Sequence, residues 1–230
     1  MNRAAAFFDL DRTFMRRSSA LALAGAFRKR GIITRRQLVR AALWQLQFAA
    51  RGADAQTVEN ATADGLRLLR GVRRDDVLEL ARGAVETTLR PLVYTDAVRL
   101  AAEHQSRAEP VFLVTSSLQE IVDPLTEACG LDGAVGSLGE VAADGTFTGR
   151  VLRARHGVGK ATAVEELAAA HDLDLSASTA YSDGHSDLPL LEAVGHPVAV
   201  NPDRDLRRVA RERGWPVLDF DGRARRHVVA

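Results

Sequence analysis

Four aspartates of this 230-residue chain stand where an apolar run gives way to polar residues. Asp9 and Asp11 come directly after one such run, and Asp183 and Asp187 come after another. Carboxylates that gather in one place repel one another unless a cation lies among them. Mg²⁺ suits such a set, because its usual ligands are a few hard oxygens together with water and phosphate. If folding brings these side chains together, they predict a magnesium site.

A second set of polar residues could bind an anion beside that cation. Thr115, Ser116 and Ser117 follow the apolar run 111–114 and offer hydroxyls, together with the N–H groups of an expected helix. Lys160 follows two nearby glycines at the start of another expected helix, where its ammonium group can offset the charge of a transferring phosphoryl group. Carboxylates, a cation, a hydroxyl and a lysine are the parts of a site that transfers phosphate.

These residues can meet only if the strands that precede them end at one edge of a sheet. From residue 110 onward short apolar runs alternate with helical patterns, which predicts an α/β fold with a doubly wound, mainly parallel sheet. Ligands bind at the carboxyl ends of the strands in such sheets. The predicted strands are 4–8, 111–114, 179–181, 198–200 and 216–218, with a hairpin of 139–141 and 147–151, and the predicted helices are 118–129, 160–171, 187 onward and 203–213.

Residues 18–90 have a different pattern, in which apolar residues recur at three- and four-residue intervals with little strand signal. This block lies between the first predicted strand and the rest of the sheet. We therefore expect a helical cap inserted into the α/β core. The predicted boundaries are 15–90 for the cap and 1–14 with 91–230 for the core.

The composition narrows the class of protein further. With 31 basic and 30 acidic side chains, the net charge of +1 argues against a dedicated nucleic-acid-binding protein. The single Cys129 cannot form an internal disulfide, which is typical of the reducing cytoplasm. We expect neither a signal peptide at residues 1–11 nor an integral membrane segment, because no run approaches the ~20 apolar residues that span a bilayer. A cytoplasmic protein follows from these observations.

The polar residues lie in short segments with a distinctive order. The segments are Phe8-Asp9-Leu10-Asp11-Arg12-Thr13, Leu113-Val114-Thr115, Lys160, 181–191 and 195–203. The first resembles the DxDxT signature of the haloacid dehalogenase (HAD) superfamily, the next three resemble its other motifs, and the last continues as in the subfamily IB hydrolases, relatives of phosphoserine phosphatase. The resemblance extends from Ala4 to Phe220 and includes the position of the cap, so it implies a HAD-type Rossmannoid core.

The resemblance also implies the reaction. Asp9 would attack phosphorus and become an aspartyl phosphate, which water then hydrolyses. Asp11 would protonate the leaving oxygen and later deprotonate the water. Mg²⁺ would be held by Asp9, by the backbone carbonyl of Asp11 and by Asp183.

The remaining motif residues would support this centre. Thr115 and Lys160 would bind phosphoryl oxygens, Asp187 would order water at the metal or the loop around Lys160, and Thr13 would brace the first turn. Each residue also has a plainer interpretation. Thr115 or Ser117 could cap a helix, Asp187 could cap the next one, and Lys160 alone could be a solvated surface lysine. The order of the motifs favours the functional interpretation.

The substrate is less closely defined. Ser18 stands where phosphoserine phosphatases carry a glutamate that binds the serine ammonium group, which argues against phosphoserine. Arg16 and Arg17 could hold a second anionic group of the substrate, with Ser116 near the phosphate, although solvated arginines would look the same in the sequence. A basic cap could also favour a larger anionic or amphipathic ester; its residues include Arg28, Lys29, Arg30, Arg35, Arg36 and Arg40, with Trp44 and Phe48 nearby.

We therefore expect an enzyme that hydrolyses a small-molecule phosphate monoester. A phosphotransferase that delivers the phosphoryl group to another acceptor is an alternative. A signalling module phosphorylated on Asp9 is a second alternative, although the cap and the additional acid Asp11 argue against it. The sequence makes no prediction of oligomeric state.

Overall fold

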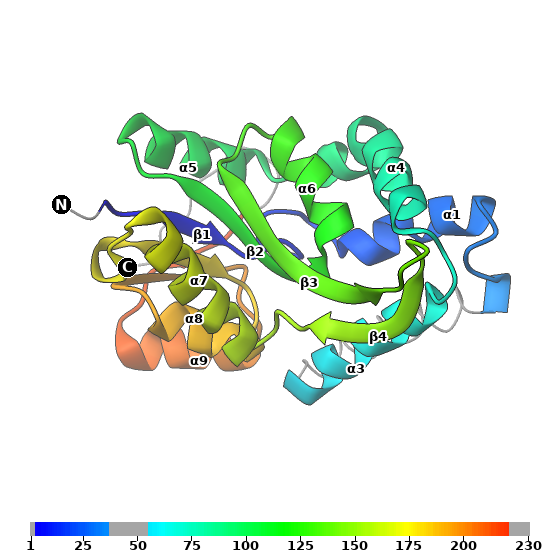
Figure 1. Cartoon of the computed structure of the whole chain (residues 1–230). Helices are drawn as coiled ribbons and strands as arrows, with labels where there is room; N and C mark the ends of the chain where they lie inside the picture. Colours follow the sequence, from blue (N-terminus) through cyan, green and yellow to red (C-terminus); the bar gives the residue numbers. More distant parts are fainter. Residues whose placement is uncertain (1–2, 37–54, 221–230) are drawn as a thin grey trace.

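The computed structural model describes residues 3–36 and 55–220 of the chain (Figure 1). Within these ranges seven strands form one sheet in the order β4-β3-β2-β1-β5-β6-β7. Neighbouring strands are parallel except for β4, which pairs with β3 in the antiparallel direction. The strands are β1 (Ala6–Phe8), β2 (Val111–Leu118), β3 (Gly133–Val141), β4 (Phe147–Arg153), β5 (Thr179–Ser182), β6 (His196–Val200) and β7 (Val217–Leu218). The predicted α/β class and mainly parallel sheet are confirmed.

Helices cover both faces of this sheet, with α5 and α6 on one face and α7, α8 and α9 on the other (Figure 1). The alternation of side chains along β1 accounts for the two layers, because Phe8 belongs to one apolar cluster and Phe7 to the other. These helices are α5 (Thr95–Ser106), α6 (Gln119–Ala128), α7 (Val158–His171), α8 (Leu188–Glu192) and α9 (Arg204–Arg213).

Two elements differ from the prediction. The strand β3 begins at Gly133, well before the predicted hairpin arm, and pairs with β2 over its first residues. Its three glycines weaken the strand signal in the sequence. They are nevertheless needed there, because a Cβ on Gly136 would lie 2.7 Å from the carbonyl oxygen of Ser117. The helix α5 was not predicted, since the helical pattern was assigned only as far as residue 90.

The predicted helical character of residues 18–90 is confirmed for the residues that the structure describes, which form α1 (Ser19–Lys29), α3 (Ala55–Leu68) and α4 (Arg74–Ala84). The connection from α3 to α4 is hydrogen-bonded to the β3–β4 hairpin, with Gly71 N–H donating to the Phe147 carbonyl at 2.9 Å and Phe147 N–H to the Val72 carbonyl at 2.9 Å. Arg74 Nε also donates to the buried Glu120 on α6 at 2.7 Å. The connection between α3 and α4 is therefore attached to the β3–β4 hairpin, at the β4 side of the sheet. Of the predicted cap residues, Arg40, Trp44 and Phe48 lie outside the described residues.

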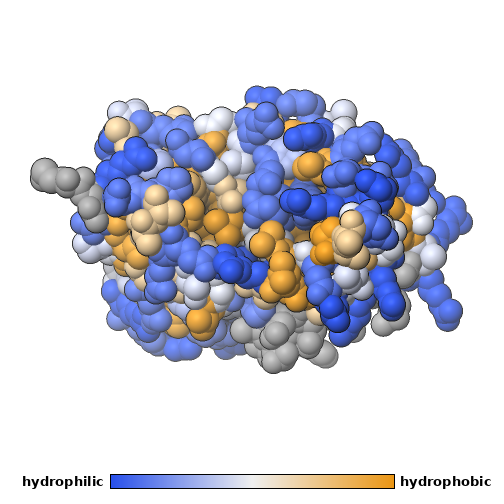
Figure 2. Space-filling model, in the orientation of Figure 1, coloured by the Kyte–Doolittle hydropathy of each residue, from blue (hydrophilic) through white to orange (hydrophobic). Residues whose placement is uncertain are grey.

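The surface is mainly polar. Figure 2 shows hydrophilic residues over most of the face in view, with small apolar areas between them. Among the residues that the structure describes, the most exposed large apolar ones are Leu152 and Val158. Among the described helices, none has the length and apolar character that crossing a membrane requires.

Candidate active site

The three central strands bring the predicted residues to one edge of the sheet. Because β1 pairs in parallel with β2 and with β5, the carboxyl ends of all three strands meet. Asp9 follows β1, Thr115 lies in β2, and Asp183 follows β5. The three residues are nearly inaccessible, with 5%, 1% and 6% of their surface exposed. Buried carboxylates are costly unless they are paired, so their presence here indicates a functional site.

Lys160 is the cation that pairs with these acids. Its side chain is 3% exposed, and Nζ lies 2.5 Å from Oδ1 of Asp9 and 2.6 Å from Oδ2 of Asp187. The turn before it requires glycine, because Gly157 has φ +49° and a Cβ on Gly159 would meet the carbonyl of Ala154 at 2.5 Å. Burial alone would lower the pKa of Lys160, but the carboxylates of Asp187 and Asp9 raise it above its ordinary value. Lys160 is therefore a fixed positive charge and not a solvated surface lysine.

Asp187 occupies the N-cap position of α8, but its carboxylate does not cap the helix. It accepts hydrogen bonds from Lys160 and, at 2.7 Å, from the hydroxyl of Ser182. Ser182 was missed by the sequence analysis. The available signal was its position as the last residue of a buried strand directly before Asp183.

Asp9 and Asp183 are two buried acids whose charges disfavour each other. Burial is the main reason that the pKa of Asp9 rises to about 7. Burial and the charge of Asp9 raise the pKa of Asp183 well above its usual range. Asp183 accepts a hydrogen bond from Thr13 at 3.3 Å and pairs with Arg12 Nε at 3.2 Å.

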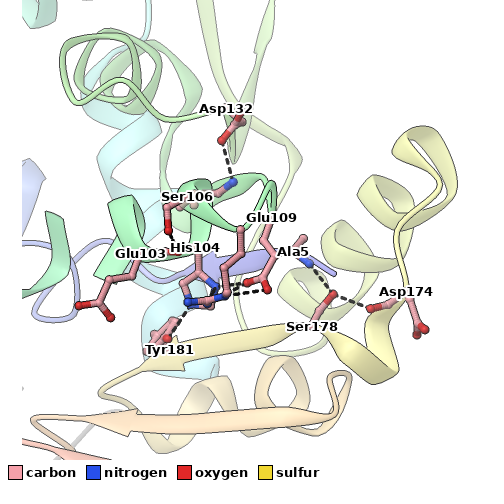
Figure 3. Close-up of polar contacts among 11 residues, drawn as sticks. Ala5, Glu103, His104, Ser106, Glu109, Asp132, Asp174, Ser178 and Tyr181 are labelled. Atoms are coloured by element: carbon pink, nitrogen blue, oxygen red, sulfur yellow. Dashed lines mark hydrogen bonds and ion pairs between the residues drawn. The ribbon is translucent and has the colours of Figure 1, made fainter. Parts of the chain in front are cut away.

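A polar network around the buried His104 connects α5 to β5 (Figure 3). His104 Nε2 lies 2.8 Å from the hydroxyl of Tyr181, and Nδ1 contacts Glu109. The ring of Phe8 stacks on Tyr181 with 4.2 Å between centroids, and the Tyr181 carbonyl accepts the N–H of Asp9 at 2.9 Å. The network therefore fixes β1 and β5, the strands that carry Asp9 and Asp183.

Asp11 lies beside these acids but faces the first turn of α1. Its Oδ1 accepts the backbone N–H of Ser19 at 2.8 Å. Burial raises the pKa of Asp11, although the hydrogen bonds from Ser19 oppose the shift. The hydroxyl of Ser19 lies 2.6 Å from that of Ser117. Ser19 thus connects α1 to both Asp11 and the end of β2. Neither contact was predicted from the sequence.

The alternative interpretation of Thr115 or Ser117 as a helix cap is wrong. The strand continues through Leu118, which is itself the N-cap of α6, so neither Thr115 nor Ser117 caps the helix. Pairing with β3 reaches Leu118 after a shift of register and keeps this segment extended. Oγ1 of Thr115 instead accepts the N–H of Ser117 at 3.1 Å. Ser116 is half-buried.

The candidate substrate arginines lie outside the aspartate cluster. Arg16 is exposed, with its guanidinium 5.9 Å from the centroid of the Tyr94 ring and Nη2 3.4 Å from the Pro91 carbonyl. Arg17 is exposed, and its side chain makes no hydrogen bond or ion pair with the residues that the structure describes. Arg16 is therefore held by neighbouring residues, whereas no described residue holds the side chain of Arg17.

Similar curated proteins include the Inhibition of morphological differentiation protein of Streptomyces azureus, 43% identical over 95% of this chain and 79% of that protein. A protein of Mycobacterium tuberculosis named "Probable phosphatase" is 38% identical over 95% of this chain and 76% of its own length. The phosphoserine phosphatase SerB1 of the same organism is 34% identical over 94% of this chain and 71% of its own length.

Solved structures show the same fold. A Bordetella pertussis protein of unknown function superposes with a TM-score of 0.80 at 28% identity, over 96% of this chain and 100% of that one. A phosphoserine phosphatase in its apo form gives a TM-score of 0.64 at 19% identity, over 90% of each chain. Residues 6–192 match the family model for haloacid dehalogenase-like hydrolases. The chain therefore belongs to the haloacid dehalogenase-like hydrolase family, as an enzyme similar to the phosphatases of that family.

Proposed function

We propose that this protein is a Mg²⁺-dependent phosphatase that hydrolyses a small-molecule phosphate monoester through an aspartyl phosphate on Asp9. The observation that carries the proposal is the contact of the buried Lys160 with both Asp9 and Asp187. A fixed ammonium group orients one oxygen of Asp9 and provides positive charge where phosphoryl oxygens would arrive. The names of the phosphatase relatives support the same activity.

The acids at this edge have the chemistry of a magnesium site. Among the described residues, no cluster of three or more His, Cys, Asp or Glu side chains has metal-binding geometry. Mg²⁺, however, is commonly bound by one or two carboxylates together with water and substrate phosphate. Asp9, Asp183 and the backbone carbonyl of Asp11 fit that mode. Burial and, second, the charge of Asp9 raise the pKa of Asp183, and a bound cation would favour its ionised form against both. When bound, Mg²⁺ would neutralise these acids and the phosphoryl oxygens.

The protein's own residues supply the remaining steps. Asp9 attacks the phosphorus atom while the bond from phosphorus to the ester oxygen breaks, and Asp11 donates a proton to that oxygen. Water then attacks the aspartyl phosphate, Asp11 takes its proton, and phosphate leaves. The raised pKa of Asp11 suits a proton donor. Because Oγ1 of Thr115 accepts a hydrogen bond from Ser117, its own proton is available to a phosphoryl oxygen.

We further propose that residues 15–90 act as a cap over the core formed by 1–14 and 91–230. The position of Ser19 supports this, because α1 reaches Asp11 directly. A relative is named a phosphoserine phosphatase, but Ser18 lacks the carboxylate expected for binding the serine ammonium group, so we propose a different small phosphate ester as the substrate. We propose a cytoplasmic location on the basis of the single free Cys129.

Removal of the metal tests the proposed function. Purified protein should release phosphate from an aryl phosphate only with Mg²⁺ present, and dialysis against EDTA should reduce turnover to the background rate. Added Mg²⁺ should restore it. Phosphate release is measured with and without an excess of alcohol acceptor, which distinguishes hydrolysis from transfer. Full activity after complete chelation would contradict the proposal.

Arg16 and Arg17 form a matched pair for testing substrate selection. If Arg16 binds a second anionic group of the substrate, Arg16→Ala should lower kcat/KM for the preferred ester by roughly tenfold or more, as expected for a lost charge-assisted hydrogen bond. Arg17→Ala should have a smaller effect, because no described residue orients that side chain. Turnover of an aryl phosphate, which lacks the second group, is the control. Identical relative rates across a panel of phosphorylated metabolites would exclude this role.

A further inference from the structure

We infer that Asp203 is a positioning residue, which holds the loop of Asp183 in the geometry needed to bind a divalent cation. The inference rests on the proposed function, since it assigns a metal to Asp183. It comes from the contacts between two loops that the sheet places side by side.

The register of the sheet brings Asp203 to this loop. The strands β5 and β6 are parallel neighbours, with Ser182 opposite Ala199. Asp183 follows the first strand directly, and residues 201–203 follow the second. The two loops therefore begin side by side at the carboxyl ends of β5 and β6, where the candidate active site lies.

Asp203 makes four hydrogen bonds. Its carbonyl accepts the N–H of Arg207 on α9 at 2.9 Å, and two of the other three bonds reach the neighbouring loop. Its backbone N–H donates to the carbonyl of Asp183 at 2.8 Å. Its Oδ2 accepts the N–H of His185 at 2.9 Å, while Oδ1 accepts the N–H of Leu206 at 2.8 Å and caps α9. The backbone N–H of Asp203 thus holds the loop before Gly184, and its carboxylate holds the loop after Gly184 while capping a helix.

The segment that carries Asp203 is rigid. Asn201 has φ +45°, a left-handed conformation that asparagine tolerates better than most residues. Its N–H donates to the Leu218 carbonyl at 2.8 Å, and its Oδ1 accepts the N–H of Phe220 at 2.8 Å. Pro202, which is buried, then restricts the backbone directly before Asp203. Asp203 is therefore anchored to β7 and α9, which do not contribute to the aspartate cluster.

This anchor matters because Mg²⁺ demands nearly ideal octahedral geometry. The side chain of Asp183 is oriented by Thr13 and Arg12, but its backbone continues into Gly184, which has no side chain to restrict it. Gly184 is held by its N–H, which donates to Oγ of Ser182 at 3.3 Å, and by its carbonyl, which accepts the N–H of Asp187 at 3.0 Å. The two hydrogen bonds of Asp203 add a restraint from outside the loop. Residues that hold a metal ligand in place without binding the metal typically contribute about 10- to 100-fold to metal affinity, which is lost when they are removed.

The simpler alternative is that Asp203 serves only as the N-cap of α9, and Asp203→Ser separates the two roles. A serine hydroxyl can accept the N–H of Leu206 and preserve the cap, but it cannot also accept that of His185. Mg²⁺ affinity is measured by isothermal titration calorimetry, and stability is measured by metal-free thermal unfolding. We expect D203S to unfold near the wild-type temperature but to bind Mg²⁺ about tenfold or more weakly. If it folds poorly, Asp203→Asn is the second variant, because one of its two acceptor oxygens is replaced by an amide nitrogen.

Asp174 provides a matched control. It precedes β5, at the opposite edge of the sheet (Figure 3), and its carboxylate accepts the N–H groups of Ser176 and Ala177 as the cap of a short 3-10 helix, Leu175–Ala177. D174A should lower the unfolding temperature and leave Mg²⁺ affinity unchanged. Wild-type affinity in a folded D203S or D203N protein would overturn the inference. Absence of Mg²⁺ binding by the wild-type protein would overturn the proposed function itself, and the inference with it.

Discussion

Asp9→Asn is expected to lower the turnover of an aryl phosphate by at least about 10⁴-fold, the scale of loss when a covalent nucleophile is removed. The amide nearly matches the carboxylate in shape but cannot form the aspartyl phosphate. Steady-state assay of the purified variant under saturating Mg²⁺ measures the effect. Activity within tenfold of the wild type would exclude Asp9 as the nucleophile.

The variant Asp9→Asn should still fold, so a fall in its turnover would report on the reaction and not on unfolding. Burial raises the pKa of Asp9 from 3.8 to about 7, so the folded protein binds this proton more tightly than the unfolded chain does. Ionisation of Asp9 therefore lowers the stability of the metal-free protein as the pH rises from 3.8 to about 7. Asparagine does not ionise. We expect metal-free D9N to unfold at or above the wild-type temperature at pH 8, and its unfolding temperature to depend less on pH between pH 5 and pH 8.

Asp11→Asn is expected to slow turnover by about 10²- to 10⁴-fold, the usual contribution of general acid–base catalysis. The loss should depend on the leaving group. An aryl oxide leaves readily without a proton, whereas an alkyl oxide needs one, so hydrolysis of alkyl esters should suffer more in the first step. The second step loses its base with either substrate.

Rapid-mixing kinetics can resolve these two steps. With an aryl phosphate, D11N should release a burst of phenol close to one equivalent per enzyme and then react slowly, because the aspartyl phosphate accumulates. Hydroxylamine should cleave the trapped acyl phosphate. The double variant D9N/D11N is the control and should show no burst. If D11N had wild-type rates with an alkyl ester, Asp11 would not be the proton donor.

The chemistry of the site could be predicted because it depends on residue types in a fixed order. Apolar runs that end on acids predicted the strands β1 and β5, and their parallel pairing brought Asp9 and Asp183 together. The predicted helix containing Lys160 was also confirmed, since glycines mark its beginning. The weaker pattern of β3 was missed because glycine is required at Gly136 by close contact with the end of β2 and the start of α6.

The sequence by itself determined the α/β class, the order of the motifs and the acids that gather at one sheet edge, because these follow from local hydrophobicity and from the geometry of parallel strands. Only the tertiary structure decided which atoms meet. Asp187 binds Lys160 in place of capping α8, and Ser19 turns toward Asp11. Asp203 binds the loop of Asp183. Such contacts join residues from separate elements, and their geometry is set by sheet register and side-chain rotamers, which no local pattern in the chain records.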